Sequence, residues 1–204
     1  MSSKRSFGRL FRVDALIASA LVLSLAGCGI NNIPTYDQQV KAAWSQVQNE
    51  YQRRADLVPN LVATVKGYAK HEAGVLEAVT EARAKVSQTR IPANILSDPK
   101  AFKQFEQNQA TLSGALSRLM VVTENYPDLK ANQNFLALQS QLEGTENRIT
   151  VARRDYILAV QKYNTELTTI PGRWYRSMFY GDKQPLQNFT ATAPNPEQAP
   201  QVKF

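Results

Sequence analysis

Apolar and aromatic residues recur every three or four positions between residues 36 and 87. This spacing is that of an α-helix with one buried face, which repeats every 3.6 residues. It predicts a single helix over residues 36–87, which at 1.5 Å per residue would be about 78 Å long. The pattern is interrupted once, at Glu72. The positions expected to be buried are Val40, Trp44, Val47, Tyr51, Ala55, Val58, Leu61, Val65, Tyr68, Val75, Val79, Ala82 and Val86.

Pro59 falls inside this predicted helix. Proline removes one backbone donor and its ring clashes with the preceding turn, so it either kinks a helix or marks the start of a new one. Tyr51, Val58 and Val65 keep the same phase across it. A break would usually reset the phase, and we therefore expect a long helix that is kinked at Pro59.

A second helix is expected after a connection at residues 88–98. Asp98 followed by Pro99 favours a helix start, because the aspartate side chain caps free backbone N–H groups and proline needs no donor there. We expect this helix to run to about Glu124. Its expected buried positions are Phe102, Phe105, Leu112, Leu116, Leu119 and Thr123.

A third helix is expected over residues 132–169, ended by Pro171 and Gly172. The following segment, "RWYRSMFYG" (173–181), is expected to form a short C-terminal helix. The expected buried positions of the third helix are Phe135, Leu138, Leu142, Thr145, Ile149, Ala152, Tyr156, Val160, Tyr163, Leu167 and Ile170.

These helices need one another, because a helix with a single apolar face is not stable alone in water. The sequence therefore predicts an all-α fold, an elongated antiparallel bundle of three main helices. The helix directions stay open. Similar lengths favour antiparallel pairing of 36–87 with 132–169, which requires an extended connection before the second helix. A simple up-down-up path needs only short turns but leaves parts of both long helices unpaired.

The N-terminus has the pattern of an export signal. Four basic residues precede the apolar run "ALIASALVLSLAG" (15–27), which is shorter than the roughly 20 residues of a membrane span. The run ends in "LAGC", which resembles the lipobox of bacterial lipoproteins. We expect residues 1–27 to be a cleaved signal peptide, Cys28 to be lipidated, and residues 28–35 to be a spacer. The alternatives are a signal peptide whose cysteine is incidental and an uncleaved anchor in the inner membrane.

By analogy with the sorting rule of such lipoproteins, Gly29 in place of an aspartate favours an outer membrane, if the cell has one. Several acyl chains would give stable anchoring where one would not. The expected partners are therefore a membrane, reached through Cys28, and an unknown envelope protein.

Composition limits the chemistry. Cys28 is the only cysteine and His71 the only histidine, so one chain forms no internal disulfide and no site with two histidines. His71 and Glu72 begin a zinc-protease pattern, but Val75 stands where the second histidine ligand is needed. We expect His71 to lie on a solvated helix face, and we predict no catalytic residue, cofactor or metal.

Paired carboxylates are expected to be structural as well. Glu77 and Glu81 lie four residues apart, and Glu143 and Glu146 three apart. Neither pair has the histidine three residues on that di-metal bundles use. Two further pairs are expected to be surface ion pairs within one helix. They are Glu81 with Lys85 and Glu50 with Arg54.

The formal net charge is +7, from 24 basic and 17 acidic residues. The basic residues are scattered among the acidic ones, whereas nucleic-acid binding needs a concentrated basic face, so no nucleic-acid partner is predicted. Residues 181–204 are rich in Pro, Gln, Asn and Thr, which predicts a disordered tail. The folded domain is expected to span residues 36–180.

Several blocks of the sequence closely resemble the LemA family. They are "YQRRADLVPNLVATVKGYAKHE" (51–72), "VTEARA" (79–84), "ENYPDLKANQNFLALQSQLEGTENRITVARRDY" (124–156) and "YNTELTTIPG" (163–172). The resemblance covers residues 36 to about 180 and implies a membrane-anchored, all-helical bundle with no activity that can be named. Many members keep a hydrophobic N-terminal segment as an anchor, and this sequence departs from them in ending that segment at Cys28.

Two features bear on binding. Asn60, Ala63, Gly67 and Gly74 form a column of small residues that allows another helix to approach closely, either the chain's own second or third helix or a partner. The aromatic and basic residues of 173–181 suit either a cap on the bundle or a membrane headgroup zone.

The function predicted from the sequence is a membrane-anchored scaffold or adaptor of the bacterial envelope. One alternative is a homo-oligomer that assembles through an uncovered face. Another is a hydrolase with an unrecognised carboxylate or serine site.

Overall fold

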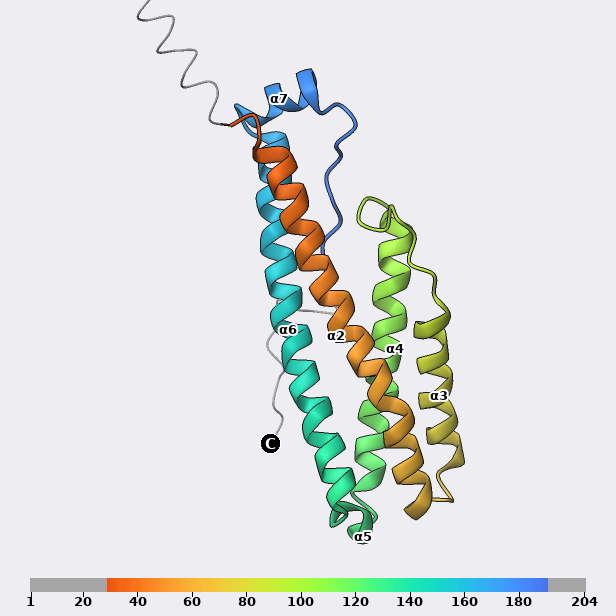
Figure 1. Ribbon diagram of the computed structural model, residues 1–204. Helices are drawn as coiled ribbons and strands as arrows, with labels where there is room; N and C mark the ends of the chain where they lie inside the picture. The colour runs from red at the N-terminus through yellow and green to blue at the C-terminus, as the bar shows by residue number, and fades with distance from the viewer. Residues whose placement is uncertain (1–28, 191–204) are drawn as a thin grey trace, which may run out of the picture.

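The computed structural model describes residues 29–190, and regular structure within this range is entirely helical. Figure 1 shows an elongated bundle, so the predicted all-α antiparallel architecture is confirmed. The helices, numbered as in Figure 1, are α2 (Asn32–Tyr68), α3 (Ala73–Gln88), α4 (Pro99–Thr123), α5 (Pro127–Lys130), α6 (Gln133–Thr168) and α7 (Gly172–Phe179).

The two longest helices, α2 and α6, pack antiparallel along their length, as their similar lengths favoured. Helix α3 folds back beside the end of α2, and α4 runs down next to α3 (Figure 1). The four-residue α5 turns the chain at one end of the bundle, which we call the α5 end. Helix α7 lies across the opposite end, the α7 end, where residue 29 also enters the fold.

The prediction of one helix over 36–87 is wrong. Helix α2 ends at Tyr68, and a turn at residues 69–72 sends α3 back in the opposite direction. The turn coincides with the interruption of the apolar pattern at Glu72. Folding back lets α3 pack on α4 as well as on α2. The α3 side chains that become buried are Leu76, Val79 and Ala82.

Helix α2 runs through Pro59 without a break, so no new helix starts there. The continuous phase of Tyr51, Val58 and Val65 predicted this continuity correctly, and all three side chains are buried. At the other end, α2 begins at Asn32, earlier than expected. Ile33 is 0 % exposed, so part of the predicted spacer 28–35 belongs to the folded bundle.

The helix start at Asp98 is confirmed. The Asp98 carboxylate accepts hydrogen bonds from the backbone N–H groups of Lys100 (2.9 Å) and Ala101 (3.2 Å). These are two of the N–H groups that a helix start leaves without a partner inside the helix, and Pro99 needs none. Within residues 29–190, no helix is both long and apolar enough to cross a bilayer.

The core has two parts. Toward the α7 end it is aromatic, with Trp44 in contact with Phe102 and Phe105 at ring-centroid distances of 5.7 and 5.1 Å. Toward the α5 end it is mainly aliphatic. The positions predicted to be buried are mostly confirmed. The exceptions are Tyr68 and Ile170, which are exposed, and Val75, Val86 and Leu138, which are partly exposed.

The prediction of disorder from residue 181 onward is wrong for residues 181–190. The backbone N–H of Leu186 donates to the side-chain oxygen of Asn164 at 2.8 Å, and the side-chain nitrogen of Asn164 donates to the carbonyl of Leu186 at 2.9 Å. The Tyr156 hydroxyl donates to the Gln187 carbonyl at 2.7 Å, and burial raises the pKa of Tyr156, which keeps this donor protonated. Phe189 packs against the aromatic core. Residues 191–204 lie outside the described range.

Candidate functional site

A buried arginine joins three helices in the middle of the bundle. Arg54 lies on α2, and its residue surface is only 1 % exposed. Its Nη2 donates to the side-chain and backbone oxygens of Gln109 on α4, at 2.6 and 3.1 Å. Its Nη1 donates to Ser113 on α4 at 2.6 Å and to Glu146 on α6 at 3.0 Å.

This cluster corrects the prediction of a surface ion pair between Glu50 and Arg54. Glu50 accepts instead from Gln46 at 3.2 Å and from Arg148 on α6 at 3.0 Å. The spacing of four residues places Glu50 and Arg54 on neighbouring turns of α2, but each side chain forms its ion pair with a residue of α6. Sequence spacing within one helix carries no information about those partners.

A cavity of about 310 Å³ lies beside the cluster. Arg54 and Arg153 line it together with Glu106 and Glu146. The Arg54 guanidinium also lies 5.0 Å from the centre of the Tyr51 ring, which is a cation–π distance. The nearest carboxylate, Glu146, is already engaged by Arg54, so it is not a free base. The cluster is arranged to hold helices together.

The candidate residues from the sequence do not converge on one another. His71 is exposed in the turn between α2 and α3, so it is solvated as predicted but lies outside a helix. Glu143 accepts a hydrogen bond from Gln139 on the same helix. Among the described residues, no three His, Cys, Asp or Glu side chains gather in a way that could hold a metal ion.

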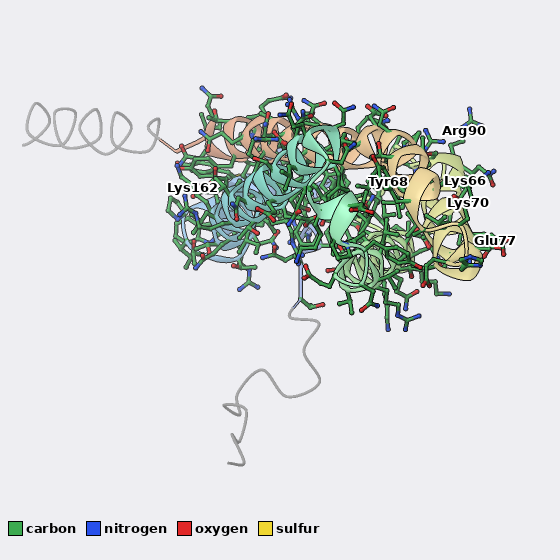
Figure 2. All side chains as sticks on the ribbon, turned by 90° about the horizontal axis from the view of Figure 1, so that it is seen from below. Lys66, Tyr68, Lys70, Glu77, Arg90 and Lys162 are labelled. Carbon is green, nitrogen blue, oxygen red and sulfur yellow. The ribbon has the colours of Figure 1, made fainter. Side chains whose placement is uncertain are left out.

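A groove of about 510 Å³ runs between the end of α2 and α3. Figure 2, seen from below and so from the α5 end, shows Lys66, Lys70 and Glu77 together along one edge of the molecule. Glu81 also lines this groove, so the predicted pair Glu77 and Glu81 borders a solvent-facing surface. The groove floor is apolar, with contributions from Val62, Ala73 and Leu76.

The small residues predicted to form one column are not covered by the chain's own helices. Asn60, Ala63, Gly67 and Gly74 are all exposed. A Cβ added to Gly67 or Gly74 would meet no other atom within 4 Å. The expectation that these residues admit the chain's own second or third helix is therefore wrong. The turn at 69–72 also places Gly74 on α3, so it no longer stands in one column with Asn60, Ala63 and Gly67 on α2.

Helix α7 closes one end of the bundle with one of its faces. Tyr175 and Tyr180 pack against the aromatic core, which confirms the predicted cap. The rest of α7 faces outward: Trp174 is 57 % exposed, Met178 64 % and Phe179 59 %.

The start of the described chain lies directly against α7. A Cβ on Gly29 would lie 3.0 Å from Cε2 of Tyr175. The Asn32 side chain donates to Glu166 near the end of α6 at 3.2 Å. Gly172 packs so closely on the last turns of α6 that a Cβ there would overlap the backbone oxygen of Glu166. The chain entry and α7 therefore form one tightly packed unit.

An ion-pair cluster reinforces this unit. Asp37 accepts from Lys41 at 2.9 Å and from Lys183 at 3.2 Å. Burial alone would raise the pKa of the Asp37 carboxyl, but the two ammonium groups outweigh it and hold that pKa below its usual value. Lys183 follows α7, so the pair connects α2 to the segment after α7. Cys28, the predicted lipidation site, lies outside the described residues.

Comparisons with known proteins identify the relatives of this chain. Magnetosome protein MamQ 2 of Paramagnetospirillum magneticum is 26 % identical over 158 residues, which cover 69 % of this chain and 58 % of that protein. Protein LemA of Metamycoplasma hominis is 24 % identical over 139 residues, covering 68 % and 59 %. Magnetosome protein MamQ of Magnetospirillum gryphiswaldense is 25 % identical over 171 residues, covering 76 % and 62 %.

The chain thus spans about three fifths of the length of these relatives. The sequence profile described as "LemA family" matches residues 43–204, which is most of the chain and includes α3, α4, α5, α6 and α7 entirely. The protein belongs to the LemA family.

Proposed function

We propose that this protein is a lipid-anchored helical scaffold of a bacterial envelope membrane. The observation that carries the proposal is the place where the chain enters the fold. Gly29 follows the predicted lipidated Cys28 directly, and it lies at one end of the bundle against α7. An anchor at Cys28 attaches the bundle by that end, with the α5 end pointing away from the membrane.

The chemistry of the described residues supports a binding role in preference to a reaction. The most buried polar cluster, at Arg54, joins α2, α4 and α6 through its own hydrogen bonds. The names of the relatives refer to the magnetosome and to the family, and they name no reaction. The proposed mechanism is presentation, in which the anchored bundle offers its polar outer face to another envelope protein.

The anchor is tested by mass analysis of the mature protein extracted from membranes. We expect a chain that begins at Cys28 and carries acyl groups on that residue. The matched Cys28→Ala variant should keep residues 1–27, because cleavage of a lipoprotein signal depends on the cysteine. A mature wild-type chain with unmodified Met1 would contradict the lipid anchor and leave the uncleaved inner-membrane anchor. A cleaved chain with an unacylated Cys28 would contradict it as well and leave a signal peptide whose cysteine is incidental.

Self-assembly is a second candidate function, and the exposed glycines Gly67 on α2 and Gly74 on α3 favour it. Gly67 and Gly74 are exposed, and a partner helix can approach the backbone closely at both positions. Replacing both glycines with leucine leaves the monomer's contacts intact, so the stability of the monomer should not fall. If the chain assembles through this face, sedimentation of the variant shows loss of the oligomer. An oligomer that survives both substitutions excludes this face.

A further inference from the structure

The outward face of α7 is apolar although it lies at the end of the bundle. Trp174 and Met178 are one helical turn apart, and both are more than half exposed, as is Phe179. Ile170, just before α7, is 64 % exposed as well. Single exposed apolar residues are ordinary on a protein surface, but here four of them fall within ten residues. We call these four residues the α7 face.

Contacts of residues in and next to α7 fix the orientation of this helix on the bundle. Tyr175 and Tyr180 take the inward positions against the core. Arg176 donates from its Nε to the carbonyl of Lys183 at 2.9 Å, which fixes the end of the helix. Gly172 seats the start of α7 against the backbone of Glu166. The helix is therefore tied at both ends, and the α7 face is not free to turn inward.

The position of the chain entry identifies the surface that α7 meets. Gly29 lies against Tyr175, so a lipid anchor on the preceding residue would attach the chain beside α7. The acyl chains proposed for Cys28 bring a bilayer surface to that point. Only residues 29–31 stand between the proposed anchor and α2, which begins at Asn32. The α7 face is then close to the headgroups whenever the anchor is inserted.

The residue types of the α7 face fit that environment. Tryptophan is enriched at the membrane–water interface, because its ring is apolar while its N–H can reach a polar partner. The exposed Arg173 lies next to Trp174, and an arginine can place its stem along apolar surface while its charge stays among the headgroups. Short amphipathic helices that lie in the interface plane bind membranes with this combination.

We infer that α7 is a membrane-interface helix, and that Ile170, Trp174, Met178 and Phe179 insert among the lipids of the bilayer that holds the anchor. This inference rests on the proposed membrane attachment and adds a second contact to it. A single acylated residue leaves a rod free to tilt about its attachment point. With α7 on the bilayer as well, the bundle has two fixed points and a defined orientation.

The chain contains its own probes for a test. It has two tryptophans, Trp174 on the α7 face and Trp44, which is 6 % exposed in the core. The full-length protein is placed in phosphatidylcholine–phosphatidylglycerol vesicles with or without bromine on the acyl chains, since bromine quenches tryptophan only on contact. We expect the wild-type protein to lose the Trp174 part of its emission in the brominated vesicles. The Trp174→Phe variant, which reports Trp44 alone, should show no loss.

A matched control places a tryptophan at an exposed site far from α7. Val121 is 70 % exposed near the α5 end, and Val121→Trp in the Trp174→Phe background should not be quenched by brominated lipid.

Three results would overturn the inference. Wild-type protein that floats with the vesicles but is not quenched places α7 away from lipid and leaves the anchor intact. Trp174 shielded from both brominated lipid and aqueous acrylamide places a protein, such as a second copy, on the α7 face. Failure to float with the vesicles contradicts the proposed membrane attachment itself.

Discussion

Arg54 and Glu146 form an ion pair in which the two partners differ sharply in their exposure to water. The Nη1 of Arg54 lies 3.0 Å from Oε1 of Glu146. The Arg54 side chain is 1 % exposed, whereas the Glu146 side chain is 43 % exposed. The carboxylate can therefore be solvated without its partner, but the guanidinium cannot. The guanidinium is therefore the partner that depends on the ion pair.

Glu146→Gln should lower the free energy of unfolding by about 2 kcal/mol, because it leaves a buried charge without its counter-charge. In the Arg54→Met background the same Glu146→Gln change should cost less than about 0.5 kcal/mol, because the guanidinium is gone and the half-exposed position 146 faces water. Arg54→Met alone also removes the hydrogen bonds to Gln109 and Ser113, so its own cost does not isolate the ion pair. Urea unfolding of the two single variants and the double variant gives the comparison. An equal loss for Glu146→Gln in both backgrounds would contradict the assignment of Arg54 as the buried, dependent partner.

Asp37 should make the α7 end sensitive to acid. Its pKa lies below the usual value of 3.8 because Lys41 and Lys183 outweigh the effect of burial. A group whose pKa is lower in the folded state stabilises the fold above its unfolded pKa, and that stability is lost as the pH falls through the folded pKa. Asp37→Asn should therefore lower the thermal midpoint at pH 7, and its difference from the wild type should shrink as the pH falls below 3.8. A difference that does not change on acidification would exclude this ion-pair cluster as the cause.

Phe189 should be part of the core even though it follows α7 by ten residues. Its ring lies 5.1 Å from Phe102 and 5.4 Å from Tyr156, and the residue is 9 % exposed. Phe189→Ala should cost about 3 kcal/mol of unfolding free energy. Phe179→Ala is the matched control, because Phe179 is 59 % exposed, and should change stability by less than about 0.5 kcal/mol. Similar effects for the two variants would show that residues 181–190 do not pack as described.

Gly172 should be required for α7 to pack against the end of α6. A Cβ at this position overlaps the backbone oxygen of Glu166, which cannot move aside as a side-chain end can. Gly172→Ala should therefore lower unfolding free energy by about 1–3 kcal/mol, although alanine is the better helix former. A Cβ at Gly181 meets nothing within 4 Å, so Gly181→Ala should be neutral. Calorimetry measures the stability of both variants. A Gly172→Ala variant as stable as the wild type would contradict the close packing of α7 on α6.

The sequence predicted the helices well because their buried faces repeat at the helical period. It did not predict the turn after Tyr68, since two antiparallel helices joined by a short turn keep the same period as one long helix. The interruption at Glu72 is the one local feature that marks the turn. The continuation through Pro59 was predictable, because the phase of the apolar residues does not change there.

Features that depend on distant partners could not be predicted from local spacing. Arg54 has the sequence environment of a surface residue, and its burial depends on Gln109 and Ser113, which are more than fifty positions away. Phe189 stands in a segment with few apolar residues, so composition predicted disorder. The Phe189 ring, the hydrogen bonds of Leu186 with Asn164 and that of Tyr156 with Gln187 connect this segment to the bundle.

The most direct test of the account measures how far each end of the bundle lies from the membrane. One dye is attached at His71→Cys, in the exposed turn after α2, and another, in a separate variant, at Ser177→Cys on α7. Helix α2 has 37 residues, so these sites are separated by about 55 Å along the bundle. With acceptor lipids in the bilayer, energy transfer should be strong from position 177 and weak from position 71. Equal transfer from both sites, or stronger transfer from position 71, would contradict attachment by the α7 end.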